Sequence, residues 1–337
     1  MSVSISEVAR RARVSISTVS RVVNGSSVVN ALTKARVEKA IAELGYQPNA
    51  FARGLTLRRS EIIGLVLPDL HGEFYSEIIR GANSQARDLG YELLISSMRD
   101  GDRGPVLDSS QRYLALLDGV VLMFAEADDN ARDLLSRVAL PFVLLDDDMP
   151  GVPHDSVIID QQAGARKLAE HLVDTRGVQR LIFVGGPATN LDTREREAAC
   201  REVMRRSGRR LDDGDIHYLN YEFETAYAFA RRSLSAWVGP GACVFAANDE
   251  MAAGIVTAAL EAGITIPGDL GIVGFDDTRI AAMMRPALTT ARVPMAEMGS
   301  RAVELLCRRL AKPDSPPTQI KLEPTLVVRD SCRVPRR

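Results

Sequence analysis

Short apolar segments alternate with amphipathic stretches along most of this 337-residue chain, starting at Ile62. The stretches between the apolar segments carry apolar residues at helical spacing. This alternation is typical of α/β proteins, in which helical crossovers join the strands of parallel sheets. The nine candidate strands cover residues 62–67, 91–97, 119–124, 142–145, 157–159, 181–184, 216–220, 243–246 and 271–273. The candidate helices include residues 73–89, 163–173, 194–206, 223–237 and 250–262.

Polar residues follow most of these strands. Nine strands are too many for the smallest α/β unit, and ligands of parallel sheets bind beyond the carboxyl ends of the strands. The sequence therefore predicts a small-molecule site among these residues. They are residues 68–69, 146–148, 160, 185–187, 220–221, 248–249 and 275–277.

The first 60 residues differ in charge from the rest of the chain. They carry ten Lys or Arg side chains and three acidic ones, whereas the remaining residues carry 32 basic and 41 acidic side chains. A basic segment on an acidic body suggests contact with a polyanion. The alternative is a basic face that meets only solvent, so the pattern inside the segment has to decide between the two.

Three short helices are predicted within this basic segment. Ser4 and Glu7 form a capping box, because the Ser4 hydroxyl can accept the Glu7 amide while the Glu7 carboxylate reaches back to the Ser4 amide. Ser15 is placed to cap the second helix, and Gly45 ends the third. The predicted helices cover about residues 5–11, 16–23 and 33–44.

Two short helices joined by about three residues form a helix-turn-helix, whose second helix fits the major groove of DNA. The valines of the second helix can face the first, which leaves its polar side chains outside. Arg21 can donate two hydrogen bonds to guanine, Ser17 can pair with several base edges, and Ile16 can contact a thymine methyl group. A three-helix core without a ligand is the alternative. The charge, the turn spacing and the polar face together favour DNA.

Two long runs in this segment, SISEVARRARVSISTVSRVVNGSSVV and LTKARVEKAIAELGYQPNAFARGL, resemble the N-terminal domain of LacI-type transcriptional regulators. The resemblance implies a helix-turn-helix DNA-binding domain over residues 1–47, followed by a hinge helix and linker over 48–60. It also implies that the hinge becomes helical on operator DNA and that Leu55 inserts into the minor groove; for Leu55 the alternative is a core residue. The implied DNA contacts are Ile16, Ser17, Thr18, Ser20, Arg21, Asn24, Asn49, Arg53 and Leu55.

Motifs in the rest of the chain, among them FYSEIIRGANSQARDLGYELLI, VFAANDEMA and IPGDLGIVGFDD, resemble the effector-binding body of the same family. That body is similar to periplasmic sugar-binding proteins, in which two lobes close on a ligand. The resemblance implies that the chain crosses between the lobes three times, near residues 161, 291 and 323. The implied near lobe covers residues 61–160 and 291–322, and the implied far lobe covers 161–290 and 323–337.

The resemblance also implies the residues that bind the effector. Arg196 and Asp276 match the pocket arginine and aspartate of the family, whereas Asp192 stands where Ser or Thr is common. A guanidinium, carboxylates, an amide and an aromatic ring together favour a sugar or sugar derivative over a purine-like effector. For each aspartate the alternative is a helix cap or a solvated loop. The implied contacts are Phe74, Tyr75, Asp160, Asp192, Arg196, Tyr221, Asn248 and Asp276.

The sequence thus predicts a DNA-binding transcriptional regulator, a repressor, which binds a roughly palindromic operator as a homodimer under the control of a small molecule. A dimer is favoured because the C-terminal tail carries no heptad pattern. The alternatives are a solute-binding protein without a DNA role, and a regulator that answers to a purine-like or protein co-effector.

Several patterns argue against other classes of protein. The chain has no phosphate-binding loop, HExxH or GxSxG motif, so no enzyme is expected. Its four cysteines form no CxxC pair and its four histidines have no ligand spacing, so neither a metal nor a cofactor is expected. There is no signal peptide and no apolar run long enough for a membrane helix, which places the protein in the cytoplasm.

Overall fold

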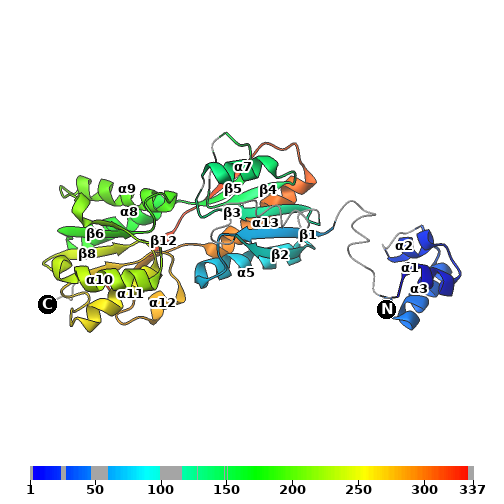
Figure 1. Ribbon diagram of the computed structural model, residues 1–337, viewed down its shortest axis with the longest axis horizontal. Coiled ribbons are helices and arrows are strands. Elements are labelled where there is room, and N and C mark those ends of the chain that lie inside the picture. The colour runs from blue at the N-terminus through cyan, green and yellow to red at the C-terminus, as the bar shows by residue number, and fades with distance from the viewer. Residues whose placement is uncertain are drawn as a thin grey trace. The chain divides into compact units, whose positions relative to one another are not determined.

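The computed structural model consists of a head, Met1–Glu61, and a body, Ile62–Arg337. Within the described residues, every strand belongs to the body (Figure 1). The structure describes residues 3–23, 28–46, 60–98, 116–126, 128–147, 149 and 151–332.

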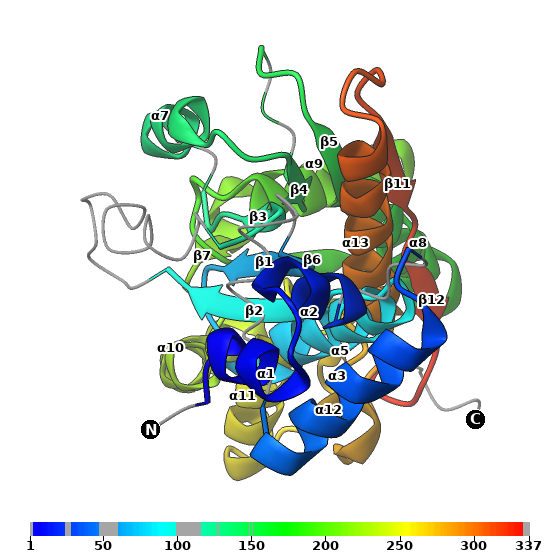
Figure 2. The ribbon, with the colours of Figure 1, turned by 90° about the vertical axis from the view of Figure 1, so that its right-hand side faces the viewer.

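Three helices form the head: α1 (Ile5–Ala12), α2 (Ile16–Val23) and α3 (Ala31–Leu44), which can be followed in Figure 2. Each helix contributes one fully buried valine to a common core, and these are Val8, Val19 and Val37. The valine face of α2 therefore points inward, as the sequence predicts.

Side-chain caps determine where the helices of the head begin. The capping box is confirmed, because the Glu7 carboxylate accepts the Ser4 amide at 2.7 Å while the Ser4 hydroxyl accepts the Glu7 amide at 3.3 Å. Helix α3 begins two residues before the predicted position. The reason is that the Asn30 side chain accepts the Thr33 amide at 2.8 Å and so caps the helix.

The body contains two parallel sheets, and all nine predicted strands are present with ends within two residues of the expected positions. The first sheet has the order β11-β5-β4-β3-β1-β2, from β1 (Ile62–Leu67), β2 (Glu92–Ser97), β3 (Gly119–Met123), β4 (Phe142–Leu145), β5 (Asp155–Ile159) and β11 (Gln319–Leu322). The second has the order β7-β6-β8-β9, from β6 (Arg180–Gly185), β7 (Ile216–Tyr218), β8 (Ala242–Ala246) and β9 (Gly271–Val273). The parallel α/β fold is thereby confirmed.

Helices cover both faces of each sheet (Figure 1). On the first sheet, α5 (Gly72–Asp88) and α13 (Met295–Ala311) lie opposite α7 (Asp129–Arg137). On the second, α8 (Gln161–His171) and α9 (Leu191–Arg206) lie opposite α10 (Phe223–Trp237) and α11 (Asp249–Glu261). The shorter elements are η1 (Leu172–Arg176), η2 (Asp213–Asp215) and α12 (Arg279–Met283). In the described ranges, no helix is both long and apolar enough to span a membrane.

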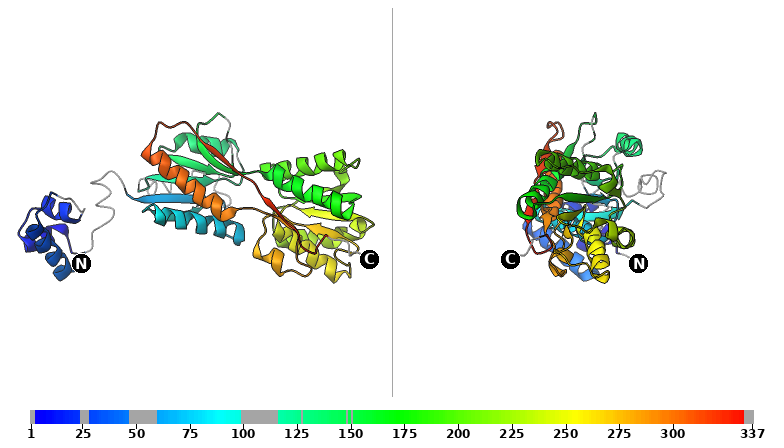
Figure 3. Two further views of the ribbon diagram at one scale, coloured as in Figure 1. Left: turned by 180° about the vertical axis from the view of Figure 1, so that it is seen from behind. Right: turned by 90° about the vertical axis from the view of Figure 1, so that its left-hand side faces the viewer.

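Each sheet with its helices forms one lobe, and the chain passes between the lobes three times (Figure 3). The connections are β5 to α8, β10 (Thr290–Arg292) to α13, and β11 to β12 (Thr325–Val327). Strands β10 and β12 form an antiparallel pair. The Lys167 ammonium holds the third connection, because it donates to the Pro324 carbonyl at 2.9 Å and pairs with Glu323 at 2.6 Å.

Helices α5 and α13 cross at backbone contact in the first lobe. A Cβ atom on Gly81 would lie 1.8 Å from the Ala296 carbonyl oxygen, and one on Gly299 would lie 2.1 Å from that of Ile78. Real Cβ atoms do not approach oxygen atoms this closely. Both positions therefore require glycine for these two helices to pack as they do.

We expect Gly81→Ala to lower the free energy of unfolding by about 1–3 kcal/mol, because the added methyl group forces α5 away from α13. Chemical denaturation of the full chain measures the change. Gly239→Ala is the matched control, since a Cβ there would meet nothing within 4 Å. Equal stability of the two variants would show that α5 and α13 do not cross at this distance.

Candidate functional site

The outer face of α2 presents polar side chains to solvent. Ile16 is 51% exposed, and Ser17 and Arg21 are exposed beside it. The Ser15 hydroxyl lies 2.8 Å from the hydroxyls of both Ser17 and Thr18, so the first turn of α2 carries a row of donors and acceptors. Thr18 and Ser20 are half-buried.

Among the described residues, the ion pairs made by basic side chains on α1 and α3 lie at the surface. Arg11 pairs with Glu43 at 2.5 Å and Lys34 pairs with Glu38 at 3.8 Å. Exposed pairs of this kind contribute little to stability, so a phosphate group can replace their acidic partners at low cost. In the described part of the head, Arg21 makes no ion pair.

Four of the predicted DNA contacts lie outside the described residues. They are Asn24, Asn49, Arg53 and Leu55. The hinge and the insertion of Leu55 therefore remain predictions.

Arg196 of α9 lies buried at the joint between the two lobes of the body. Its guanidinium donates to the Gln161 side-chain oxygen from Nε at 3.0 Å and from Nη2 at 2.8 Å, and it also donates to the Ala247 carbonyl. It lies 4.0 Å from the centre of the Phe275 ring. Because Gln161 directly follows the first lobe crossing, Arg196 ties that crossing to the ends of the second sheet.

Two carboxyl groups from opposite lobes meet beside Arg196. Asp146 follows β4 in the first lobe and accepts the Gln161 side-chain amide at 3.4 Å, and Asp192 lies on α9 in the second lobe. Asp192 lies 3.7 Å from the Arg196 guanidinium. Burial raises the pKa of both groups, and the charge of Asp192 raises the pKa of Asp146 further. The ionised form of each group is therefore disfavoured unless a positive group lies nearby.

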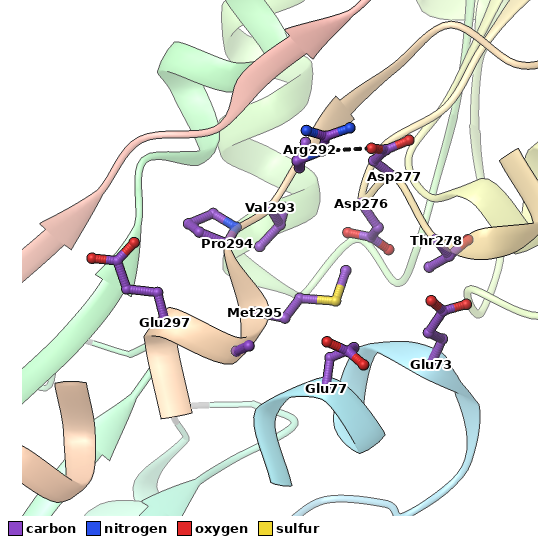
Figure 4. Close-up of a pocket in the computed structure, with 11 residues that line it drawn as sticks. Glu73, Glu77, Asp276, Asp277, Thr278, Arg292, Val293, Pro294, Met295 and Glu297 are labelled. Carbon is purple, nitrogen blue, oxygen red and sulfur yellow. Dashed lines mark hydrogen bonds and ion pairs between the residues drawn. The ribbon is translucent and has the colours of Figure 1, made fainter. Parts of the chain in front are cut away.

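Asp276 follows β9 and faces an open pocket of about 240 Å³ (Figure 4). Asp276 is only 8% exposed. No other described residue donates a hydrogen bond to its carboxylate. Burial raises the pKa of Asp276 well above its usual value, although the charge of Arg196 opposes that shift. The carboxylate is therefore placed to accept hydrogen bonds from a bound molecule.

The pocket lies between elements of both lobes. Glu73 and Glu77 of α5 line it from the first lobe, and Asp277 and Thr278 line it from the second. Residues 292–297, which carry the second crossing, complete the wall. Figure 4 shows Asp277 paired with Arg292, at 2.6 Å.

Tyr75 of α5 brings an aromatic ring to the same acidic groups. Burial and, to a smaller extent, four negative charges together raise the pKa of its hydroxyl to about 12. Those charges belong to Asp69, Asp146, Asp276 and Asp192. Phe74 packs edge-on against Tyr75, with ring centres 5.3 Å apart. Tyr75, Asp192, Arg196 and Asp276, all predicted effector residues, are therefore electrostatic neighbours, and of these four Asp276 lines the pocket.

Tyr221 and Asn248 are held by hydrogen bonds within the second lobe. The Asn248 side chain caps α11 by accepting the Met251 amide at 2.9 Å, and it donates to the Tyr221 carbonyl at 2.9 Å. The Tyr221 hydroxyl donates to Asn190 at 2.9 Å. Burial raises the pKa of Tyr221 to about 12.

Asp160 makes contacts typical of a helix cap. Its carboxylate accepts the Ala163 amide at 2.9 Å at the start of α8 and pairs with Lys321 at 2.9 Å. Although partial burial opposes ionisation, the bonds to Lys321 and to the Ala163 amide hold the pKa of Asp160 below its usual value.

Several residues of the site were not among the predicted contacts. Asp146 and Asp277 belong to the polar strand ends noted in the sequence, so their positions gave a signal. Glu73 and Glu77 gave no such signal, because the same helical segment carries other charged residues that face solvent. Gln161 and Arg292 reach the site through the lobe crossings, which no local pattern specifies.

Comparison with known proteins identifies the chain. A profile of bacterial regulatory proteins of the lacI family matches residues 4–49, and one of periplasmic binding protein-like domains matches residues 169–332. The ribose operon repressor of Escherichia coli (strain K12) is 32% identical over 329 residues, which cover 97% of this chain and 98% of the repressor. Catabolite control protein A of Priestia megaterium is 31% identical and covers 99% of this chain and 100% of that protein.

The chain belongs to the lacI family of bacterial regulatory proteins. Solved structures agree with this assignment. The lac repressor dimer bound to operator and the anti-inducer ONPF is 27% identical, with a TM-score of 0.87 and coverage of 99% of this chain and 100% of that one. The complex of the regulator CelR with cellobiose is 28% identical, with a TM-score of 0.73 and coverage of 98% and 99%. The protein is a DNA-binding transcriptional regulator with a two-lobed body, and not an enzyme.

We expect Asp276→Asn to stabilise the regulator increasingly as the pH rises from about 4 to about 8. In the folded chain Asp276 keeps its proton to a higher pH than in the unfolded chain, so wild-type stability falls across this interval. The asparagine variant has no such proton. Thermal unfolding of both proteins across the interval measures the difference, and a difference that does not change with pH would contradict the burial of this carboxylate.

Proposed function

We propose that the regulator is a repressor that binds a roughly palindromic operator as a homodimer. A sugar or sugar derivative bound between the lobes controls its affinity for the operator. Residues 1–47 are the DNA-binding domain in this proposal, 48–60 the hinge, and 61–337 the effector-binding body. We assign the regulator to the cytoplasm, where the operator is found.

The polar cluster at the lobe joint is the observation that carries the proposal. A buried guanidinium, carboxyl groups from both lobes and the Tyr75 hydroxyl are electrostatic neighbours there, and Asp276 lines a pocket between the lobes. Carboxylates and a guanidinium fork pair with ring hydroxyls, and an aromatic ring covers the apolar face of a sugar. The related structures add support, because CelR is described in complex with cellobiose.

Contacts next to Asp276 offer a route from the effector to the lobe crossings. Asp277 pairs with Arg292 beside the second crossing and with Arg329 beyond β12, each at 2.6 Å. Asp249 accepts from the Thr278 amide at 2.8 Å and from the Thr290 hydroxyl at 2.7 Å. A ligand that moves the loop of Asp276 therefore acts on the segments that set the angle between the lobes.

Other contacts across the joint hold the lobe angle in this arrangement. The Arg279 amide donates to Glu73 at 2.8 Å, and the Thr189 hydroxyl donates to Glu126 at 2.5 Å. A ligand changes the lobe angle only to the extent that it binds one arrangement more tightly than another. In the proposed mechanism the lobe angle sets the separation of the two hinges in a dimer, and thereby their ability to hold DNA.

We expect Arg21→Ala to weaken operator binding by about 1–3 kcal/mol and to relax the preference at one base pair, because a bidentate contact to a base is lost. Gel retardation with operator fragments and single-base variants of them measures both effects. Arg232→Ala, on the exposed surface of α10, is the control for loss of one positive charge. Equal weakening on operator and random DNA would place Arg21 on phosphate instead.

We expect Asp276→Ala to abolish the response to the effector while sparing DNA binding, because the lost carboxylate is the proposed acceptor for the ligand and belongs to the body. A thermal-shift screen of sugars identifies compounds that stabilise the wild-type regulator by mass action. The same compounds are then added to gel-retardation reactions with genomic DNA fragments. The proposal fails if no fragment is retained better than random DNA, or if no sugar alters that retention.

A further inference from the structure

Acidic groups outnumber basic ones at the lobe joint. Among the described residues, Arg196 is the one Lys or Arg side chain that is fully buried. Although burial lowers the pKa of Arg196, the surrounding groups raise it above its usual value. These groups are Tyr221, Asp192, Asp276 and Asp146. One positive charge thus faces three carboxyl groups.

Hydrogen-bond donors at the joint are largely occupied by the protein itself. Three N–H groups of Arg196 donate to Gln161 and Ala247. The Tyr221 hydroxyl donates to Asn190, and the Asn248 amide donates to the Tyr221 carbonyl. The groups that face a ligand are therefore mainly acceptors, and a matching ligand is rich in donors.

The other acidic side chains of the pocket already have positive partners. Glu77 pairs with Arg80, Glu73 lies 3.9 Å from the Arg279 guanidinium, Glu297 pairs with Arg301, and Asp277 pairs with two arginines. Asp146 and Asp276 make no ion pair with a described Lys or Arg side chain, and Asp192 lies 3.7 Å from Arg196, the one positive charge near all three. Of these, Asp276 is more than nine-tenths buried and faces the pocket without a hydrogen bond from the described residues (Figure 4).

A metal ion is not the positive partner that these three carboxyl groups lack. In the part of the chain that the structure describes, no three His, Cys, Asp or Glu side chains are placed to hold one. A ligand ammonium group suits Asp146 and Asp192 better, because its N–H groups can donate to both carboxylates and its charge favours their ionised forms.

We propose that the effector is a polyol bearing a protonated amino group, and that Asp192 and Asp146 bind this group while hydroxyls of the ligand reach Asp276. The inference rests on the proposed function, since it names the chemical class of the effector for the same site. Asp192 is the residue that determines this specificity. Sugar acids and sugar phosphates are disfavoured, because each would bring a further negative charge to the joint.

Amino sugars and their parent sugars test this proposal directly. D-glucosamine, D-galactosamine and D-mannosamine are compared with D-glucose, D-galactose, D-mannose and sodium D-gluconate by thermal shift of the full-length regulator. Calorimetry then gives dissociation constants for the compounds that stabilise it. We expect at least one amino sugar to bind about tenfold or more tightly than its parent sugar, as charge-assisted hydrogen bonds allow.

Two variants of Asp192 link this preference to the carboxyl pair. Asp192→Asn and the smaller Asp192→Ser remove the charge, so each should bind the amino sugar and its parent with similar affinity. Asp314→Asn, on an exposed loop, removes the same charge elsewhere and should keep the wild-type preference. Thermal unfolding without ligand checks that each variant is folded.

Each outcome decides for or against the inference. It is overturned if no amino sugar stabilises the wild type, if the parent sugar or gluconate binds as tightly, or if the preference survives in both Asp192 variants. A neutral sugar that stabilises the regulator and changes its hold on DNA would leave the proposed function standing while the inference fails. If no sugar of any class does so, both fail.

Discussion

A buried guanidinium at the joint of two lobes is the interaction on which the arrangement of the body depends. Moving a charged group out of water costs several kcal/mol, and the cost is recovered only where partners surround the group closely. Arg196 finds such partners in Gln161, Ala247 and Phe275, which lie at the start of α8 and beyond the ends of β8 and β9. The contacts of this one side chain therefore hold the ends of β8 and β9 against the first lobe crossing.

The same joint stores unfavourable backbone and charge arrangements that a ligand can relieve. Asp276 and Asp277 both have positive φ, at 110° and 58°, which non-glycine residues rarely adopt. Asp146 has a φ of 54° at the end of β4. Strained backbone and close carboxyl groups persist only where the surrounding structure holds them, and such positions are common at ligand sites. The positive φ angles and close carboxyl groups at the joint, which lower the stability of the fold, are thus features of a ligand-binding site.

Much of the fold was accessible from sequence, because the period of the apolar residues differs between strands and helices. Most of the nine predicted strands consist largely of consecutive apolar residues, and their ends are marked by polar turns. Strands β10, β11 and β12 were not predicted, since each is short and β11 alternates exposed with half-buried residues at the edge of its sheet. Their positions are set by the lobe crossings and not by local pattern.

The site was accessible only in part. Family motifs pointed to Tyr75, Arg196 and Asp276, which are electrostatic neighbours in the structure, whereas Asp160 makes the contacts of a helix cap. The proximity of Asp146 to Asp192 could not be predicted, because the two residues belong to different lobes and come near each other, through Gln161 and Arg196, only when both sheets are in place. Sequence indicates which residue types a site contains, and tertiary packing decides which of them meet.

Thermodynamic linkage between the two ligands of the regulator tests its central claim most directly. If an effector at the lobe joint controls DNA binding, operator DNA must change the affinity for that effector by the same factor as the effector changes the affinity for DNA. Calorimetric titration of the effector into the free regulator and into its operator complex measures this factor. The account predicts two different effector affinities whose ratio equals the shift in operator affinity, and identical effector affinities with and without DNA would contradict it.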